Sequence, residues 1–278
     1  MNAKFIKRFI KRKSSVIGGV MILIFIFVAI VGPFLCTQNP LKIDVRDKYQ
    51  NPSKKHWLGT DNLGRDTFTR LVYGARISLL VSFVSVMAGT IVGVFLGVIS
   101  GYYGGRVDTI IMRITDILLA FPGLLLAIAI VAILGSGIIN TMIAIAFYSV
   151  PYIARIVRGT VLSIRELEFI QACKTIGCSN FAIIFYHIIP NSMPQVIVNT
   201  TLRLGTAILT SSALSFLGLG VQPPHPEWGA MLSTARETIR SSPLAALAPG
   251  IAITLVVISF SLLGDGLRDA LDPKLKNS

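Results

Sequence analysis

The chain has 278 residues, of which 53% are apolar and 14% are charged, and its mean hydropathy is +0.71. A soluble domain of this length is not so apolar, so the composition predicts an all-α protein of the membrane. The net charge of +13 does not indicate nucleic acid, because many of the basic residues flank apolar spans, where membrane lipid and topology account for them.

Six apolar segments are long enough, or nearly long enough, to cross a bilayer as helices. They cover residues 16–36, 77–100, 117–135, 138–154, 195–219 and 244–263. The third carries Pro122, the fourth has Pro151 near its end, and the fifth contains Arg203. Between the third and the fourth only Ser136 and Gly137 remain, which predicts a tight turn between two antiparallel helices.

Basic residues at the start of the chain set the expected orientation. Residues 1–15 carry six of them, and Lys and Arg mark the cytoplasmic side of a membrane protein. We therefore expect a cytoplasmic N-terminus (1–15), a first transmembrane helix (16–36) that is retained rather than cleaved as a signal peptide, and an external loop (37–76). A five-helix core (77–268) and a cytoplasmic tail (269–278) follow.

The basic residues of the expected external loop run against this rule. They are Lys42, Arg46, Lys48, Lys54, Lys55, Arg65 and Arg70. Asp44, Asp47, Asp61 and Asp66 offset part of this charge, although acidic residues have little weight in the rule. The N-terminal cluster and this loop thus favour opposite orientations, and we keep the one that places the N-terminus in the cytoplasm.

Four glycines recur every four residues in and just after the second span: Gly89, Gly93, Gly97 and Gly101. This period keeps neighbouring glycines near one face of the helix and lets another helix backbone approach closely. The pattern predicts a tight helix contact, and it indicates packing rather than substrate binding.

Residues 164–176 mix charged and apolar side chains at near-helical spacing, which is typical of a short amphipathic helix outside the hydrocarbon. Gly177 is a natural helix stop, because glycine accepts the left-handed conformation at low cost. Ser179 or Asn180 then caps a second helix that is expected to end at Pro190. The alternative is an interfacial helix that only lies on the membrane surface.

Arg203 is the one full charge well inside a predicted span. A central arginine costs about 2.5–3.5 kcal/mol on the insertion scale, so such residues usually face protein or water. Two interpretations remain open. Arg203 either extends its side chain outward to the cytoplasmic interface, or it faces a cavity near an inner gate and pairs with an acidic residue.

Residue types that form disulfides, bind metals or hold phosphate are sparse. The three cysteines give no disulfide framework, and the three histidines are far apart, so no metal site is expected. No Gly-Lys-Ser or Gly-Lys-Thr occurs, so the chain has no phosphate-binding loop. If the protein takes part in a process that uses ATP, another chain binds it, and we expect no cofactor here.

Gln171-Ala172-Cys173, then Gly177, then His187-Ile188-Ile189-Pro190 resembles the EAA loop of bacterial ABC-importer permeases. The family pattern is Glu-Ala-Ala, three residues, Gly, nine residues, Ile, one residue, Leu-Pro. Ala172, Gly177 and Pro190 fall on register. Gln171 occupies the position of the first Glu, and Cys173 that of the second Ala. His187 and Ile189 replace the Ile and the Leu of the pattern. In the family, this loop is the cytoplasmic hook for an ATPase subunit.

Three further stretches are similar to the C-type membrane subunits of dipeptide, oligopeptide and nickel importers. The first runs from His56-Trp57-Leu58-Gly59-Thr60-Asp61 to Tyr73-Gly74-Ala75-Arg76. The second joins Ser215-Phe216-Leu217-Gly218-Leu219-Gly220 to Pro223-Pro224 and Pro226-Glu227-Trp228-Gly229. The third is the tail Gly264-Asp265-Gly266-Leu267-Arg268-Asp269 with Asp272-Pro273. The motifs span nearly the whole chain from His56 onward.

The resemblance implies a six-helix type I ABC-importer permease fold in the bacterial inner membrane, with a cytoplasmic coupling loop at about 164–190. Its ATPase-coupling residues are Glu168, Gln171, Ala172, Cys173, Gly177 and Pro190. The implied partners are a second, related permease, two cytoplasmic ATPases that bind ATP and Mg, and an external solute-binding protein. The chain itself then forms half of the pore and catalyses no chemical step.

The external stretch contains Pro223, Pro224, Glu227 and Trp228. The prolines stiffen the chain, and Trp228 is expected to anchor it at the membrane edge. Residues 231–239 are expected to form a short helix over the pore mouth. This stretch is either a structural cap or a contact surface for the binding protein, and both roles are compatible.

The family resemblance leaves the cargo open: di- or oligopeptides, or in the alternative nickel or a metal chelate. The rival from another class is an ATP-independent channel or secondary transporter. Such proteins often carry paired acids within their helices, whereas the six predicted spans contain no Asp or Glu. The sequence therefore favours an ATP-driven importer of peptides.

Overall fold

The computed structural model describes residues 9–240 and 242–271, and every regular element in these ranges is a helix, apart from one bridge between Thr60 and Asp66. In chain order the elements are α2 (Lys13–Leu35), η1 (Val45–Asp47), α3 (Thr67–Tyr103), α4 (Gly105–Leu119), α5 (Gly123–Leu134), α6 (Ile138–Arg165), α7 (Glu168–Thr175), α8 (Asn180–Ala182), the π-helix η2 (Ile183–Ile188), α9 (Ile189–Phe216), α10 (Trp228–Ala235), η3 (Arg236–Thr238) and α11 (Pro243–Leu271).

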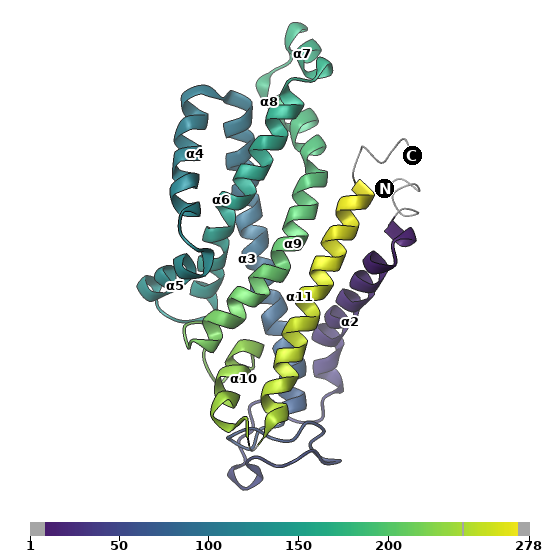
Figure 1. Cartoon of the computed structure of the whole chain (residues 1–278), viewed down its shortest axis with the longest axis vertical. Helices are drawn as coiled ribbons and strands as arrows, with labels where there is room; N and C mark the ends of the chain where they lie inside the picture. Colours follow the sequence, from purple (N-terminus) through teal and green to yellow (C-terminus); the bar gives the residue numbers. More distant parts are fainter. Residues whose placement is uncertain (1–8, 241, 272–278) are drawn as a thin grey trace.

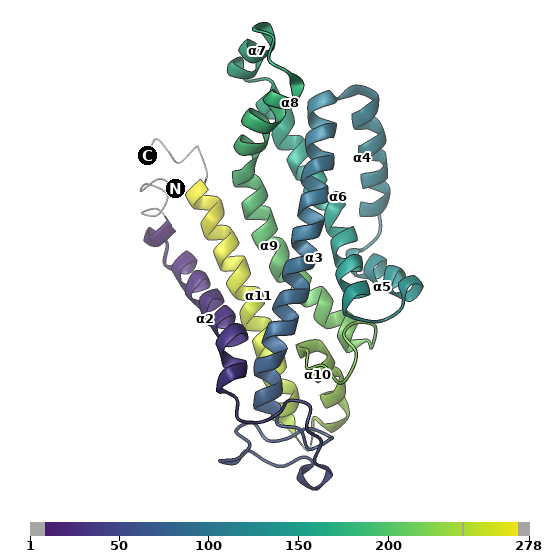
Figure 2. The same cartoon turned by 180° about the vertical axis from the view of Figure 1, so that it is seen from behind.

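The long helices run roughly alongside one another, with α7 at one end of the molecule and α10 at the other (Figure 1). The described start of α2 and the described end of α11 lie toward the α7 end, where Arg12 and Asp269 form an ion pair. The segment between α2 and α3 lies at the α10 end, and Figure 2 shows the same arrangement from behind.

Within the described residues, five helices are long and apolar enough to cross a membrane: α2, α3, α6, the continuous run Asn180–Phe216, and α11. The pair α4–α5 adds a sixth crossing if it is counted as one broken span. The prediction of an all-α membrane protein is confirmed.

The third span, expected at 117–135, is not one continuous helix. α4 and α5 meet at an angle of 91°, and the break lies between Leu119 and Gly123. Pro122 explains the break, because it has no amide hydrogen and disfavours helical backbone in the residue before it. The predicted tight turn at Ser136 and Gly137 does join α5 to α6.

Two other expected boundaries are also wrong. α3 begins at Thr67, so residues 67–76 belong to a helix and not to the external loop. Asp66 caps this helix, since its carboxylate accepts a hydrogen bond from the amide of Thr69 at 2.7 Å. α6 continues through Pro151 as far as Arg165, so the fourth span is longer than its uncharged part.

The helix expected to stop at Pro190 instead continues to Phe216. Pro190 lies in the first turn of α9, and the π-helix η2 carries the chain into α9 without a break. The α7 segment, defined here as residues 166–190, is therefore joined directly to a membrane-spanning helix.

The four glycines of α3 lie against α6. A Cβ atom added to Gly89, Gly93, Gly97 or Gly101 would come within 2.6 to 2.8 Å of an α6 atom. Side chains larger than hydrogen do not fit at that separation, so glycine permits the close approach of these two helices.

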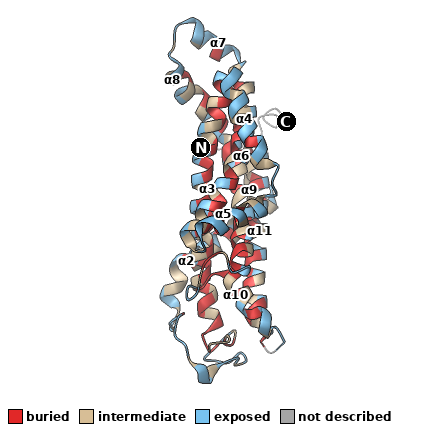
Figure 3. Cartoon of the chain, turned by 90° about the vertical axis from the view of Figure 1, so that its left-hand side faces the viewer, coloured by how far each residue is buried: buried red, intermediate tan, exposed pale blue. Residues whose placement is uncertain are grey.

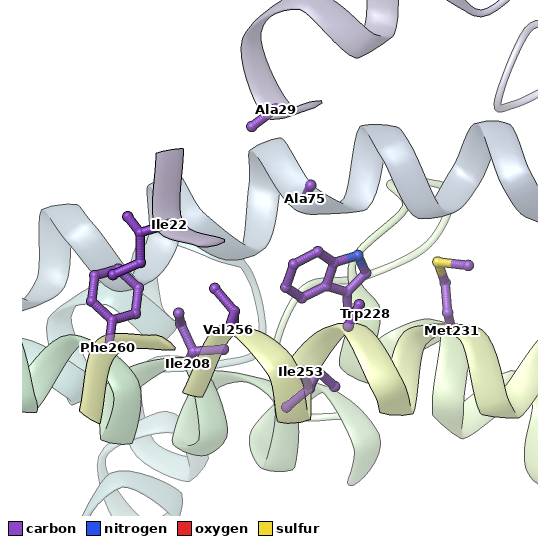
Figure 4. Close-up of a cluster of buried hydrophobic side chains, with 10 residues drawn as sticks. Ile22, Ala29, Ala75, Ile208, Trp228, Met231, Ile253, Val256 and Phe260 are labelled. Carbon is purple, nitrogen blue, oxygen red and sulfur yellow. The ribbon is translucent and has the colours of Figure 1, made fainter. Parts of the chain in front are cut away.

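A cluster of buried apolar side chains lies between α2, α3, α9 and α11, with Trp228 of α10 inside it (Figure 4). Ile22, Ile208, Val256 and Phe260 pack in the same cluster. The short helix α10 is thus fixed to the bundle by its first residue.

Candidate functional site: the α7 segment and the polar face of the bundle

The α7 segment projects beyond the end of the bundle and is largely exposed (Figure 3). Ile170 is its anchor, with 0% of its surface exposed, and it packs with Ile183 and Ile188 of η2 and Val161 of α6. The opposite side of the segment presents apolar side chains to the surroundings: Leu167, Phe169, Ile176, Phe181, Phe185 and Tyr186.

Local hydrogen bonds fix the shape of this segment. Gly177 ends α7 with φ of +82°, as expected for a left-handed helix stop. The Ser179 hydroxyl accepts a hydrogen bond from the amide of Ala182 at 3.2 Å and so caps the next helix. The amide group of Gln171 donates to the carbonyl of Arg165 at 3.0 Å, which ties α7 back to the end of α6.

The predicted coupling residues do not share one environment. Glu168, Gln171, Ala172 and Gly177 are exposed on α7 and its end. Cys173 is half-buried, and its Sγ lies 3.7 Å from Nε2 of His187. Pro190 is exposed but lies beyond η2, in α9. The structure therefore groups the first five residues and separates the sixth from them by η2.

The expectations for Glu227 and Trp228 as partner surface at the membrane edge are wrong. Trp228 is 1% exposed, and its Nε1 donates to the carbonyl of Leu71 at 3.0 Å. Glu227 is 0% exposed and accepts hydrogen bonds from the Ser78 hydroxyl and from the amide of Ala230. Burial raises the pKa of the Glu227 carboxyl. Both side chains are structural.

Pro223 and Pro224 are exposed, together with His225. The peptide bond between the two prolines is cis. This tip is the part of the stretch that stays accessible at the α10 end. Residues 231–235 are helical as expected, in α10, and η3 extends the helix to Thr238.

The segment between α2 and α3 is held by ion pairs. Asp61 accepts from Arg65 at 2.7 Å and lies 3.5 Å from Arg70. Lys55 donates to Asp47 at 2.7 Å, and this bond holds the pKa of the Asp47 carboxyl below its ordinary value. Three of the basic residues that run against the expected orientation are thus paired with acids.

Arg203 lies midway along α9. Its guanidinium carbon is 4.0 Å from the centre of the Tyr152 ring and 5.2 Å from that of Tyr148. Its Nε atom is shielded and has no hydrogen-bond partner, and no carboxylate within the described ranges forms an ion pair with it. The acidic partner expected for it is therefore not found in this part of the chain, and its side chain lies on two aromatic rings.

Around Arg203, polar side chains of α6 and α9 gather on one side of the bundle. The residues are Gln195, Asn199, Thr206 and Thr210 on α9 with Tyr148, Tyr152, Arg155 and Gly159 on α6. Of the residues on this side, only Arg203 was predicted from the sequence. The signal for the rest was present, because the α9 residues recur every three or four positions and so share one face of the helix.

Within the described ranges, no group of three or more His, Cys, Asp and Glu side chains is placed to hold a metal ion. What the geometry offers is a contact surface at one end and a polar face along the bundle.

The fold resembles those of solved importers. It superposes on the inward-facing MetNI methionine ABC transporter with a TM-score of 0.60 at 19% identity, covering 73% of this chain and 96% of that chain. It superposes on a chain of an amino acid ABC transporter with a TM-score of 0.56 at 15% identity, covering 72% and 94%. At these identities the likeness establishes the fold alone.

Two proteins are similar along almost the whole chain. The dipeptide transport system permease protein DppC of Alkalihalophilus pseudofirmus is 53% identical over 271 residues, 98% of this chain and 89% of that protein. The glutathione transport system permease protein GsiD of Pectobacterium atrosepticum is 46% identical over 275 residues, 99% of this chain and 91% of that protein.

Two family descriptions match different parts of the chain. Residues 3–52 match the N-terminal TM domain of oligopeptide transport permease C. Residues 93–277 match the binding-protein-dependent transport system inner membrane component, which includes α7 and most of the bundle. The chain therefore belongs to the family of inner-membrane components of binding-protein-dependent transport systems, and it is a permease subunit of an ABC importer.

Proposed function

We propose that this permease subunit imports short peptides that an external binding protein delivers, and that ATP hydrolysis by partner chains drives the import. The observation that carries the proposal is similarity along almost the entire chain to permeases named for dipeptide and glutathione transport, glutathione being itself a short peptide. Nickel and metal chelates receive no comparable support from these relatives.

The α7 segment is the proposed docking site for an ATPase subunit. The segment projects past the bundle and carries exposed apolar side chains, of which Ile176 is 77% exposed. Apolar patches on a water-facing surface mark protein contacts. The small residue Ala172 is exposed on the same helix, so a partner surface can approach the α7 backbone closely.

The proposed orientation places the α7 end in the cytoplasm. Two features of the structure support it. The described start of α2, next to the basic N-terminal cluster, lies toward the α7 end. At the α10 end, Lys55, Arg65 and Arg70 are engaged in ion pairs with Asp47 and Asp61, so these side chains are not free to pair with anionic lipid.

The connection between α7 and α9 supports a mechanical role. Gly177 and the Ser179 cap lead directly into η2 and α9, a helical run without a break from Asn180 to Phe216. When the ATPases close, a displacement of α7 is then passed to a helix that crosses the membrane. ATP acts on the permease only by binding more tightly to the assembly in one of its two states. ATP and Mg belong to the partner chains, and this chain carries out no chemical step.

At the opposite end, the exposed tip 223–225 is the proposed contact for the external binding protein. Glu227 and Trp228 support the tip from below, since both are buried beside α3. The second permease is expected to complete the pore, because one subunit supplies only half of it.

Co-purification from the native membrane tests this function. The chain, carrying an affinity tag, is solubilised gently, and mass spectrometry identifies the proteins that stay bound. We expect two ATPase chains, a second permease and a binding protein that holds a short peptide. A lone chain or a homo-oligomer that still transports after ATP depletion would refute the importer. A binding protein loaded with a nickel chelate would refute the peptide cargo.

A further inference from the structure

The exposed surface of the bundle has two kinds of face. On α2, α3 and α11 the large exposed side chains within the spans are apolar, as lipid contact requires: Leu23, Phe27 and Ile30 on α2; Leu80, Phe83, Ile91 and Phe95 on α3; Leu247, Ile251 and Leu255 on α11. The exposed Thr254 and Ser261 of α11 return their hydroxyls to the carbonyls of Gly250 and Val257 in the same helix. The face made by α6 and α9 is different, because Gln195, Tyr152, Arg155 and Thr206 are exposed on it. Polar groups are costly in hydrocarbon, so this face adjoins water or protein.

Two arginines lie on the polar face, and their surroundings differ. Arg155 forms an ion pair with Asp116 of α4. Arg203 has no such partner among the described residues, and its Nε is shielded from solvent without a hydrogen bond. The charge of Arg155 is therefore balanced within this chain, whereas that of Arg203 is not.

The tyrosine rings hold the Arg203 side chain in place. Stacking at 4.0 Å from the centre of the Tyr152 ring is a favourable cation–π distance. The Tyr148 hydroxyl is 3.2 Å from the Thr210 hydroxyl, which fixes the second ring against α9. The guanidinium is thus positioned in advance, midway along a membrane-spanning helix, and its positive charge is left available to an anion.

We infer that Arg203 is an anion-binding residue on the water-filled translocation face of this subunit, and that it takes the carboxylate of a peptide in transit. The inference rests on the proposed function for the identity of the cargo. Every linear peptide with a free C-terminus carries a carboxylate, whatever its side chains. The planar guanidinium fork binds a carboxylate through two parallel hydrogen bonds.

Position 203 also suits a transient site. It lies on the same unbroken helical run as η2, the part of the α7 segment that leads into α9. When a displacement of α7 moves α9 relative to α6, it also moves Arg203 relative to Tyr148 and Tyr152 of α6. The site then has two arrangements with different affinities, which a translocation site needs in order to accept and release its cargo.

Cysteine labelling in the assembled transporter tests whether this face is aqueous and attracts anions. Cys36, Cys173 and Cys178 are first replaced by serine, and Thr206, one turn from Arg203, is replaced by cysteine. The probes are a negatively charged and a positively charged methanethiosulfonate reagent of similar size. We expect both to react, with the anionic reagent favoured about tenfold. The preference should disappear in Arg203→Gln and persist in Arg155→Gln.

Leu255→Cys on α11 is the matched control, because this exposed side chain lies on an apolar face; we expect it to stay unmodified. A cysteine at position 206 that does not react would mean that a partner chain covers this face. Arg203 would then pair with an acidic residue of the second permease, and the inference would fail. Equal reaction with both reagents would also overturn it.

Transport by Arg203→Gln tests the carboxylate. We expect peptide uptake into proteoliposomes to fall about tenfold, the loss of one favourable charge interaction, while the loaded binding protein still stimulates ATP hydrolysis. Arg203→Lys, which keeps the charge, should recover part of the uptake. Unchanged uptake in Arg203→Gln would overturn the assignment. If the labelling is as expected but the wild-type assembly takes up no peptide, the proposed function has failed and the anion-attracting face still stands.

Discussion

The two ends of the molecule are built differently, although both carry motifs that resemble partner-binding sequences. The α7 segment (166–190) is exposed and is anchored mainly by Ile170. The α10-end assembly, defined as residues 37–66 and 217–240, buries its most distinctive side chains, among them His56, Asp66, Glu227 and Trp228. A motif at one end of a membrane protein can therefore either contact a partner or hold the fold together, and the burial of its side chains distinguishes the two roles.

Substitutions at the two ends should therefore have different effects, on the stability of the fold at one end and on partner binding at the other. At the α10 end, removing a side chain breaks ion pairs and packing that join α3, α10 and α11, so the fold is weakened. In the α7 segment, the exposed side chains make few contacts within the chain, so their removal should leave the fold intact and change only what binds there.

Trp228→Ala should have the largest effect. It removes a fully buried ring and the hydrogen bond to Leu71, and such a loss costs about 3–5 kcal/mol. We expect a strongly reduced yield of folded protein and a lower midpoint of thermal unfolding in detergent. Trp57→Ala is the matched control, because this second tryptophan is 65% exposed. Equal effects of the two substitutions would contradict the claim that the α10 end is structural.

Glu227→Ala should come next. It removes the cap of α10 and leaves the Ser78 hydroxyl without its acceptor, at a cost of about 1–3 kcal/mol. Glu227→Gln retains an oxygen acceptor and should lose less. Thermal unfolding of the wild type and both variants measures the two costs.

The same residue predicts a pH dependence. Burial raises the pKa of the Glu227 carboxyl in the fold, so folding favours its protonated form. The wild type should lose stability as pH rises from the ordinary carboxyl range through the raised pKa, and Glu227→Gln should lack this loss. Unfolding measured at about pH 5 and about pH 8 compares them. A difference between the two proteins that does not change with pH would count against a buried, raised-pKa carboxyl.

Gly177→Val should have a small effect on stability and a large one on transport. A Cβ atom added at position 177 would meet no atom within 4 Å. The cost in stability is therefore that of the left-handed backbone alone, about 1–2 kcal/mol. We expect normal insertion and protein level but uncoupled transport, measured as peptide uptake. Gly105→Val is the matched control, since Gly105 also has positive φ and open space but lies outside the α7 segment. Normal uptake by Gly177→Val would contradict the coupling role.

Ile176→Ser should have the smallest effect on the fold, within about 0.5 kcal/mol, because the side chain is 77% exposed. It should nevertheless reduce the amount of ATPase that co-purifies with the chain. Ile170→Ser, which alters the buried anchor of the same helix, should lower stability as well. If Ile176→Ser kept the full complement of ATPase, the exposed apolar patch would not be the contact.

Much of the fold followed from the sequence because hydropathy and glycine spacing report directly on helices in a membrane. The apolar runs gave the spans, and the conformational freedom of Gly177 gave the end of α7. Both signals are local. By contrast, the break at Pro122 was missed because the segment around it is apolar on both sides, and the early start of α3 was missed because Arg70 and Arg76 interrupt its apolar run.

The candidate site was only partly predictable for a different reason. Whether Trp228 faces water, lipid or core depends on helices distant in sequence, such as α2, whose Phe25 packs edge-on against it at 6.0 Å. The rings under Arg203 come from α6, and no spacing within α9 reveals them. Sequence patterns thus assign residues to helix faces, while the partner of each face comes from the packing of the whole bundle.

The central claim is that the α7 segment binds an ATPase. Photo-crosslinking in the native membrane tests it most directly. A photoreactive amino acid replaces the exposed Ala172 in one variant and the exposed Trp57 in another, and mass spectrometry identifies the captured proteins. We expect an ATPase subunit to be crosslinked from position 172 and none from position 57. Capture of the external binding protein from position 172, or of an ATPase from position 57, would contradict it.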